Sequence, residues 1–232
     1  NLNLQIEPVE QANKNEALVN NISHLTGCGI VYVTLQQTAE HVADYLKAAG
    51  INANAYHAGM DTESRQIIQQ QFMSNQVQVI VATIAFGMGI DKSDIRFVIH
   101  YNMPKSLENY YQETGRAGRD GMEGNCLGFF SYRDMNKLEK FMRDKSVAER
   151  EVGGQHLEEV VNYSELAGCR REFLLNYFGE KHVCDRKGMC DNCRIPREQI
   201  ETQNEVVLIL ESVLALRENF TTKYVIQFLL GS

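Results

Sequence analysis

Short apolar runs rich in β-branched residues alternate with segments of helical periodicity, and this alternation constrains the fold more than any other feature. The apolar runs are bounded by glycine or polar residues, as is typical of buried strands, and cover residues 29–34, 51–57, 77–82, 96–101 and 124–131. Apolar residues at helical spacing predict helices at residues 36–49, 61–74, 107–116 and 131–145. Strands that alternate with helices form βαβ units and a mostly parallel sheet. We therefore predict an α/β fold over residues 26–146.

Two of these helices carry end signals. Gly50 follows the helix predicted at residues 36–49, where a residue in the left-handed conformation commonly ends a helix. Ser131 and Asp134 have the spacing of a capping box and are expected to open the helix at residues 131–145.

The two ends of the chain have a different pattern. Residues 1–25 are rich in Asn and Gln, and we predict a linker that leads into a helix. After residue 146 the strand signal disappears, and helical patterns occupy residues 148–167, 170–177, 199–216 and 221–230. We therefore expect a small, mostly helical domain at residues 147–198 and the truncated start of another domain at residues 199–232.

Composition limits the partners and the location. The chain has 23 Lys and Arg against 30 Asp and Glu, a net charge of −7, which weighs against non-specific binding to phosphates. A local basic stripe can still form a nucleic-acid groove, because net charge is a sum over the whole surface. No apolar run approaches the roughly 18 residues of a membrane span, and no secretory signal opens the chain. We expect an intracellular protein that does not enter a membrane.

The cysteines indicate a metal site. Cys28 and Cys126 stand alone in apolar runs and are expected to be buried. The other four cysteines are clustered: Cys169, Cys184, Cys190 and Cys193. Zn²⁺ takes four thiolates in a tetrahedron, and a Cys-x2-Cys pair places two on one tight turn. We predict structural zinc, because four protein ligands leave no open catalytic position; His182 as a ligand and redox cysteines are the alternatives.

A glycine-rich stretch follows the strand predicted at residues 77–82. Gly87 and Gly89 lie two residues apart, and glycines at the carboxyl end of a strand let backbone amides approach a phosphate closely. Asp91 follows them and could accept hydrogen bonds from a ribose or from metal-bound water. The alternative is an ordinary turn.

An arginine-rich stretch ends the helix predicted at residues 107–116. Arg116 and Arg119 lie on one side of a single turn, an arrangement that favours an anion between or beyond them. A solvated charged turn is the alternative. Because both stretches follow strands of one sheet, they together indicate a nucleotide or nucleic-acid phosphate site.

Four segments of the chain resemble RecQ-family helicases. They are YHAG at 56–59, VATIAFGMGI at 81–90, YYQETGRAGRDG at 110–121, and CRR followed by NYFGE within 169–180. The first three resemble superfamily-two helicase motifs IV to VI, and the last, with the cysteines after it, resembles the RecQ zinc domain. The likeness runs from about residue 26 to residue 194.

The resemblance implies a domain organisation. Residues 26–146 would be the second RecA-like lobe, preceded at 1–25 by a linker from an N-terminal helicase lobe. Residues 147–198 would be the zinc-binding domain, and 199–232 the start of a winged helix. ATP and Mg²⁺ would lie between the two lobes, and closure of the cleft would drive 3′-to-5′ movement on DNA in recombination and repair.

The resemblance also implies roles for individual residues. Arg119 would be the arginine finger, and Arg116 a second contact to the γ-phosphate. The nucleotide site would further include Gln112, Asp91 and Gly89. The residues expected to contact DNA are His57, Thr83, Arg170 and Arg171. For the last two, packing and local ion pairing are the alternative.

The chain departs from a complete helicase in two ways. It contains no Gly-x4-Gly-Lys-Ser/Thr stretch and no Asp-Glu-x-His, so it should hydrolyse ATP negligibly by itself. Thr34-Leu-Gln-Gln37 also differs from the Ser-Arg often found after the first strand in the family, which puts a contact at that position in doubt.

Three functions remain in competition. The first is half of a DNA helicase motor, acting as a monomer on single-stranded DNA and duplex junctions, cytoplasmic and nucleoid-associated in a bacterium or nuclear in a eukaryote. The second is a non-enzymatic zinc-bearing module that binds nucleic acid or a partner. The third, an RNA helicase, is disfavoured by the segment at 169–180. The presence of both Arg116 and Arg119 favours the first.

Overall fold

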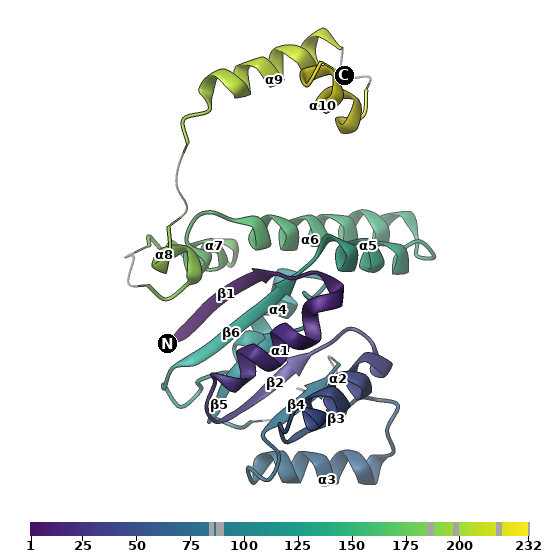
Figure 1. Ribbon diagram of the computed structural model, residues 1–232, viewed down its shortest axis with the longest axis vertical. Coiled ribbons are helices and arrows are strands. Elements are labelled where there is room, and N and C mark those ends of the chain that lie inside the picture. The colour runs from purple at the N-terminus through teal and green to yellow at the C-terminus, as the bar shows by residue number, and fades with distance from the viewer. Residues whose placement is uncertain (84–85, 87–90, 185–187, 197–199, 217–219, 232) are drawn as a thin grey trace. The chain divides into compact units, whose positions relative to one another are not determined.

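The computed structural model describes residues 1–232 except 84–85, 87–90, 185–187, 197–199, 217–219 and 232 (Figure 1). The chain divides into two compact units, Asn1–Pro196 and Arg197–Ser232. The first unit contains the sheet and the helices that follow it. The second contains two helices, α9 (Gln203–Ala215) and α10 (Thr222–Leu229).

The first unit is built on a parallel sheet of six strands in the order β1-β6-β5-β2-β4-β3. The strands are β1 (Leu2–Pro8), β2 (Cys28–Tyr32), β3 (Ala53–Tyr56), β4 (Val79–Ala82), β5 (Ile95–His100) and β6 (Gly124–Phe130). All five strands predicted from apolar runs are present, and the predicted α/β class is confirmed. Because every strand runs in the same direction, the side chains that follow the strands meet at one edge of the sheet.

Helices cover both faces of this sheet. They are α1 (Lys14–Ser23), α2 (Gln36–Ala48), α3 (Thr62–Met73), α4 (Leu107–Thr114), α5 (Tyr132–Phe141), α6 (Val147–Glu165), α7 (Arg170–Tyr177) and α8 (Asp191–Arg194). Successive side chains of a strand point to opposite faces. Accordingly, Val31 lies in the core with α1 and α2, whereas Ile30 and Tyr32 lie in the core with α3, α4 and α6.

The prediction of a linker at residues 1–25 is wrong for the first part of that segment. Leu2–Pro8 forms β1 and pairs with β6 in parallel, from Leu2 opposite Gly124 to Pro8 opposite Phe130. A short 3₁₀ turn, Gln11–Asn13, then leads into α1, the helix that was expected there. Leu4 and Ile6 are buried, whereas their neighbours Asn3, Gln5 and Glu7 are polar, a period of two that the Asn- and Gln-rich composition obscured.

Helix ends agree with the sequence in one case and not in another. Gly50 follows α2 with φ of 83°, the left-handed conformation that favours glycine. Ser131 lies at the N-cap of α5, but its side chain accepts no capping hydrogen bond. Asp134 instead turns inward toward Lys14, so the predicted capping box is not formed. A complete capping box opens α6, where Ser146 and Glu149 bond reciprocally.

The segment after residue 146 packs onto the sheet. Val160 and Tyr163 of α6 and Leu174 of α7 belong to the same buried cluster as Tyr110 of α4. The sheet, α4, α6 and α7 therefore share one buried cluster, and the division at residues 146 and 147 stays a prediction. So does the winged-helix assignment of residues 199–232. Among the described residues, no helix is both long and apolar enough to cross a membrane.

Candidate functional site

Arg119 and Asp91, two residues predicted for a nucleotide site, lie next to each other. The Arg119 Nη1 atom is 3.0 Å from Asp91 Oδ1, and its Nε donates to the Gly115 carbonyl at 3.2 Å. The Arg119 side chain is 39 % exposed and the Asp91 side chain 87 % exposed. An ion pair this exposed contributes little free energy, so Arg119 can exchange Asp91 for another anion at small cost.

Arg116 is held differently, because its side chain is buried. Its positive charge acts to lower the pKa of the Tyr32 phenol, but the larger effect of burial raises that pKa. Its Nε atom has no hydrogen-bond partner among the described residues. A buried guanidinium donor without a partner is costly, which is typical of a group that awaits a ligand. Gln112, on the preceding turn of α4, is exposed, and Gly89 lies outside the described residues.

His57 and Thr83, two of the residues expected to contact DNA, lie at the carboxyl ends of neighbouring strands. His57 directly follows β3 but is only 4 % exposed, and its Nε2 is 3.2 Å from Glu40 Oε1. Thr83 directly follows β4, is half-buried, and donates its amide to the Tyr56 carbonyl at 3.4 Å. The strands bring both residues to one edge of the sheet, where Thr83 is the more accessible of the two.

Arg170 has the packing role that the sequence left as an alternative. The expectation that Arg170 contacts DNA is therefore corrected. Its side chain is 1 % exposed, with Nε donating to Asp191 Oδ1 at 2.6 Å and Nη1 to the Tyr163 carbonyl at 2.7 Å. A guanidinium whose donors are satisfied in the core has nothing to offer a phosphate. Arg171 is half-buried and donates to the Leu2 carbonyl at 3.5 Å.

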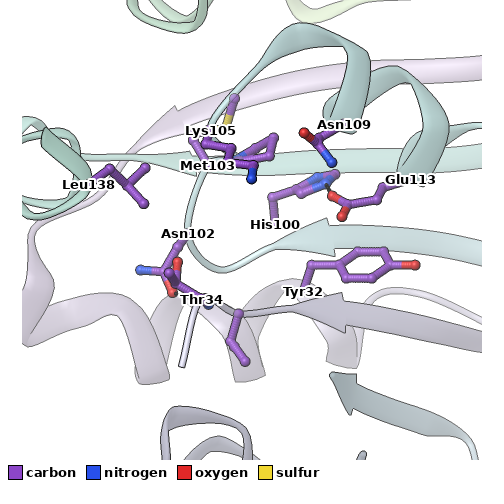
Figure 2. A pocket seen from close by; sticks show the side chains of 11 residues that line it. Tyr32, Thr34, His100, Asn102, Met103, Lys105, Asn109, Glu113 and Leu138 are labelled. Atoms are coloured by element: carbon purple, nitrogen blue, oxygen red, sulfur yellow. Dashed lines mark hydrogen bonds and ion pairs between the residues drawn. The ribbon is translucent and has the colours of Figure 1, made fainter. Parts of the chain in front are cut away.

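A pocket of about 180 Å³ lies where β2 and β5 end, between these strands, α4 and α5 (Figure 2). Its polar lining comes from three stretches of the chain. The polar residues are Tyr32, Thr34, His100, Asn102, Lys105, Asn109 and Glu113. The single cation among them, Lys105, and the side-chain amides of Asn102 and Asn109 are donors that suit a phosphate or a sugar.

Three residues of this pocket form a buried polar group that the sequence analysis did not single out. His100 Nε2 lies 2.7 Å from Glu113 Oε2, and the His100 ring stacks on Tyr32 with 5.5 Å between ring centroids. Figure 2 shows the side chains of His100 and Glu113 next to each other. Burial raises the pKa of Tyr32 far above its ordinary value. A polar residue that ends an apolar strand, as His100 does, was the available signal. Glu113 lies inside the stretch already noted at 110–121.

Three of the four predicted zinc ligands come together in the fold. The Sγ atoms of Cys169, Cys184 and Cys193 all lie within 4.8 Å of one another, and those of Cys184 and Cys193 are 3.3 Å apart. Cys190 is buried and is not among these three close thiols, although its carbonyl accepts from the Cys193 amide at 3.2 Å. With Zn–S bonds of about 2.3 Å, a tetrahedral site places sulfurs roughly 3.8 Å apart. Three of the four thiols therefore fit a zinc ion, and Cys190, at the start of the same turn as Cys193, is the candidate for the fourth ligand.

Hydrogen bonds hold this cysteine cluster against the sheet. The Leu4 amide donates to the Met189 carbonyl at 3.1 Å, and the Ile6 amide donates to Asp191 Oδ2 at 3.0 Å. Asn192 donates to the Leu166 and Gly168 carbonyls at 2.6 and 2.8 Å. Asp191 and Asn192 thus do more than form the turn between the last two cysteines, because they join it to β1 and to the end of α6.

Two family models match the chain. The helicase conserved C-terminal domain matches residues 13–121, and the RecQ zinc-binding domain matches residues 132–194. The fold is similar to that of the C-terminal domain of the DEAD-box protein Dbp5, with a TM-score of 0.51 and 22 % identity over 66 % of this chain and 96 % of that one. That likeness supports the RecA-like fold of the lobe.

Curated relatives agree with the family models. The chain is 39 % identical to the ATP-dependent DNA helicase RecQ of Pasteurella multocida, over 88 % of this chain and 32 % of that protein. It is 36 % identical to the ATP-dependent DNA helicase Q1 of Pongo abelii, over 99 % of this chain and 36 % of that protein. The chain thus spans about a third of the length of these relatives. It belongs to the RecQ helicase family, of which it carries the conserved C-terminal helicase region and the zinc-binding region.

Proposed function

We propose that this chain is the C-terminal half of the motor of an ATP-dependent DNA helicase and supplies two arginines to a nucleotide held by another lobe. The observation that carries the proposal is the pairing of an exposed, loosely held Arg119 with a buried Arg116 whose Nε has no partner among the described residues. Such donors stabilise the charge that develops on a transferred phosphoryl group. Asp91 and Gln112 would face the ribose or the Mg²⁺ shell of the same nucleotide.

The DNA strand would cross the edge of the sheet where β2, β4 and β5 end. Thr83 lies at this edge, as do the pocket residues Lys105 and Asn109. Lysine and amide donors contact the sugar–phosphate backbone without reading bases, which suits a motor that moves along any sequence. The 3′-to-5′ direction and the preference for single strands and duplex junctions follow from the family resemblance.

We further propose that the cysteine cluster binds one structural Zn²⁺ through Cys169, Cys184, Cys190 and Cys193. Four thiolates complete the tetrahedron and leave no position for catalysis. The metal would fix the Cys190–Cys193 turn, which contacts β1 through Leu4 and Asp191.

The test of the motor is DNA-stimulated ATP hydrolysis. We expect an undetectable rate with this chain alone, and turnover when the chain is joined to its native upstream lobe. In the joined protein, Arg119→Ala should lower kcat by about 10³-fold or more, because an arginine finger acts only on the transition state. Arg150→Ala, which removes an exposed arginine on α6, is the matched control and should leave kcat unchanged.

Two results would reject the proposal. A joined protein that binds DNA but never hydrolyses ATP would be a scaffold, which was the second function considered from the sequence. An Arg119→Ala variant with the kcat of the parent protein would remove Arg119 from the catalytic machinery.

A further inference from the structure

We infer that α5 carries the local basic stripe that an acidic chain needs in order to bind DNA, and that this stripe borders the groove at the carboxyl ends of β2 and β5. The stripe consists of Arg133, Lys137 and Lys140, and its partner is the sugar–phosphate backbone of a single DNA strand. The inference deepens the proposed function and rests on its DNA-binding part. It adds a surface that the sequence analysis did not single out.

The three basic residues lie on one side of α5. At about 100° per residue, positions 133, 137 and 140 fall within an arc of roughly 60° around the helix axis. All three residues are exposed. In the part of the chain that the structure describes, Arg133 and Lys140 form no ion pair, and Lys137 lies 3.5 Å from Asp134 Oδ1. The charges of the stripe are therefore available to an anion.

The acidic residues of α5 do not cancel this charge. Asp134 is buried, and its Oδ2 atom accepts from the buried Lys14 at 2.6 Å. Glu139 falls on the other exposed flank of α5, together with Tyr132, whose hydroxyl donates to Glu165 Oε1 of α6 at 2.5 Å. The stripe is thus a local excess of positive charge on a chain whose net charge is −7.

The stripe borders a groove that extends the pocket already described. The 180 Å³ pocket of Figure 2 adjoins a second pocket of about 60 Å³, and both are lined by Thr34, Asn102 and Leu138. Lys105 is the cation that lines the larger pocket, and Lys137 of the stripe is the cation that lines the smaller one. The two pockets therefore form a path from the loop after β5 to α5, with a cation in each part.

Exposed apolar side chains complete the groove. Leu35 and Phe141 line the smaller pocket and are 48 % and 58 % exposed. A base of any identity can stack on an exposed aromatic ring, and a cationic groove with such a ring is how proteins hold single strands without reading their sequence. An acidic peptide would use the cations but has no flat bases to stack on Phe141. The groove therefore favours a nucleic-acid strand.

The test measures the binding of fluorescein-labelled oligothymidine to this chain by fluorescence anisotropy at several salt concentrations. The stripe variant combines Arg133→Gln, Lys137→Gln and Lys140→Gln. We expect its Kd to rise at least about tenfold, and the slope of log Kd against log salt to fall by about 2, because each phosphate contact to a single strand contributes roughly 0.7 to that slope. Since the three residues are exposed, its thermal midpoint should match that of the parent.

The matched control combines Lys47→Gln, Arg150→Gln and Lys181→Gln. These substitutions remove three exposed cations that lie outside α5 and change the net charge by the same amount. The control should keep the salt slope of the parent and a Kd within about twofold of it. The comparison separates direct contacts of the stripe from the long-range field of the whole protein.

Phe141→Leu tests the stacking part of the groove, because it keeps an apolar side chain and removes the ring. We expect Kd to rise about fivefold or more at an unchanged salt slope, since a stacked base contributes affinity but releases no counterion. Tyr132→Leu is its control, because Tyr132 is an exposed aromatic residue on the other flank of the same helix. The Tyr132 variant should bind like the parent.

The protein joined to its upstream lobe distinguishes this inference from the motor assignment. There the stripe variant should need at least about tenfold more DNA for half-maximal ATP hydrolysis, with an unchanged kcat at saturating DNA. If the stripe variant instead matches the parent in both assays, the stripe is rejected while the motor assignment stands. If the joined protein never hydrolyses ATP but the stripe variant still loses DNA affinity, the motor assignment fails and the DNA surface stands.

Three other results would reject the stripe. The first is a parent chain that does not bind oligothymidine. The second is an equal loss of affinity in the control triple variant, because net charge would then explain the effect. The third is displacement of the labelled strand by poly-glutamate as effectively as by unlabelled oligothymidine at equal charge, because the surface would then bind any polyanion.

Discussion

Lys14 is a fully buried lysine, and its surroundings explain how a charge is tolerated there. Its Nζ donates to Asp134 Oδ2 at 2.6 Å and to the Tyr101 carbonyl at 2.5 Å, and Asn102 donates to the same carboxylate oxygen at 2.7 Å. Burial lowers the pKa of Lys14 against the opposing effect of Asp134. Burial alone would raise the pKa of Asp134, but the bonds from Lys14 and Asn102 outweigh it and the pKa is lowered.

Breaking this pair should be costly. Lys14→Met would leave Asp134 buried without its cation, and we expect the free energy of unfolding to fall by about 3–5 kcal/mol. Combining it with Asp134→Leu removes both charges and should recover a large part of that loss. Urea unfolding measures both values. Lys47→Met, which removes an exposed lysine paired with Asp44, is the control and should change stability by less than about 1 kcal/mol. If Lys14→Met also lowers the free energy of unfolding by less than about 1 kcal/mol, the buried pair of Lys14 and Asp134 does not stabilise the fold as described.

The lowered pKa of Asp134 also predicts a dependence on pH. A carboxylate whose folded pKa lies below its unfolded value of about 3.9 stabilises the fold above that value. The contribution is lost as pH falls through the lower, folded pKa. Asp134→Asn should therefore be much less stable than the parent at neutral pH, and the difference should shrink below about pH 4. Urea unfolding at several pH values tests this, with exposed Asp44→Asn as the control. If the difference in the free energy of unfolding does not change with pH, the charge of Asp134 is not what stabilises the fold.

Among the elements, the Cys190–Cys193 turn is bonded to parts of the fold that are distant in sequence. It lies against β1 through the Leu4 and Ile6 amides and against α7 through the Arg170–Asp191 ion pair. Because β1 lies at the edge of the sheet, the turn contacts a strand that has only one other neighbour, β6. The cysteine cluster thus stabilises the edge of the sheet as well as its own loop.

Removal of the metal should destabilise β1 as well as the cysteine loop. We expect one zinc per chain, and treatment with a chelator should lower the thermal midpoint and increase hydrogen exchange in β1 as well as in the cysteine loop. Cys193→Ser should reduce the zinc content, whereas Cys28→Ser should retain it because Cys28 lies in β2, outside the cluster. Zinc content by colorimetric assay and hydrogen exchange by mass spectrometry give the result. If hydrogen exchange in β1 is unchanged after zinc removal, the cysteine cluster does not stabilise β1.

Elements whose signal is local were predictable from the sequence, and those that depend on distant partners were not. Strands such as β2 and β4 are apolar throughout because both faces of the sheet are covered, so they stand out in any window. β1 has only three large apolar residues, and only its pairing with β6 makes it a strand. Arg170 was predicted to contact phosphate because its partner, Asp191, is distant in sequence and no local pattern indicates the pair. The His100–Glu113 pair was missed for the same reason.

For the molecule as a whole, the two units bury their apolar side chains to different extents. The core of residues 1–196 is continuous from the sheet to α7, while apolar side chains of α9 and α10 such as Leu208, Leu214 and Phe228 are exposed. The first unit therefore contains what it needs to fold. The helices of the second expose apolar surface of the kind that proteins bury.

A chain ended after Pro196 should keep the thermal midpoint of the full chain within about 3 °C, because no core residue of the first unit lies beyond it. A chain ended at Ser146 is the comparison. It loses Val160 and Tyr163 from the core, along with the zinc ligands, and should unfold at a clearly lower temperature or fail to fold. Thermal melts followed by circular dichroism distinguish the two. A large loss in the longer chain would mean that residues 197–232 support the first unit.

The placement of β1 has a consequence for how the protein is made. Asn3 bonds to Asn125 across 122 positions, and the Ile6 amide meets Asp191 across 185 positions. At roughly 5–20 residues per second, a ribosome that has just released β1 needs on the order of 10 seconds or more to supply these partners. During that interval a strand with open edges and one apolar face is free to pair wrongly. The nascent chain can therefore mispair at β1 until its partners are made. A chaperone that shields β1 during this time would raise the yield of folded protein.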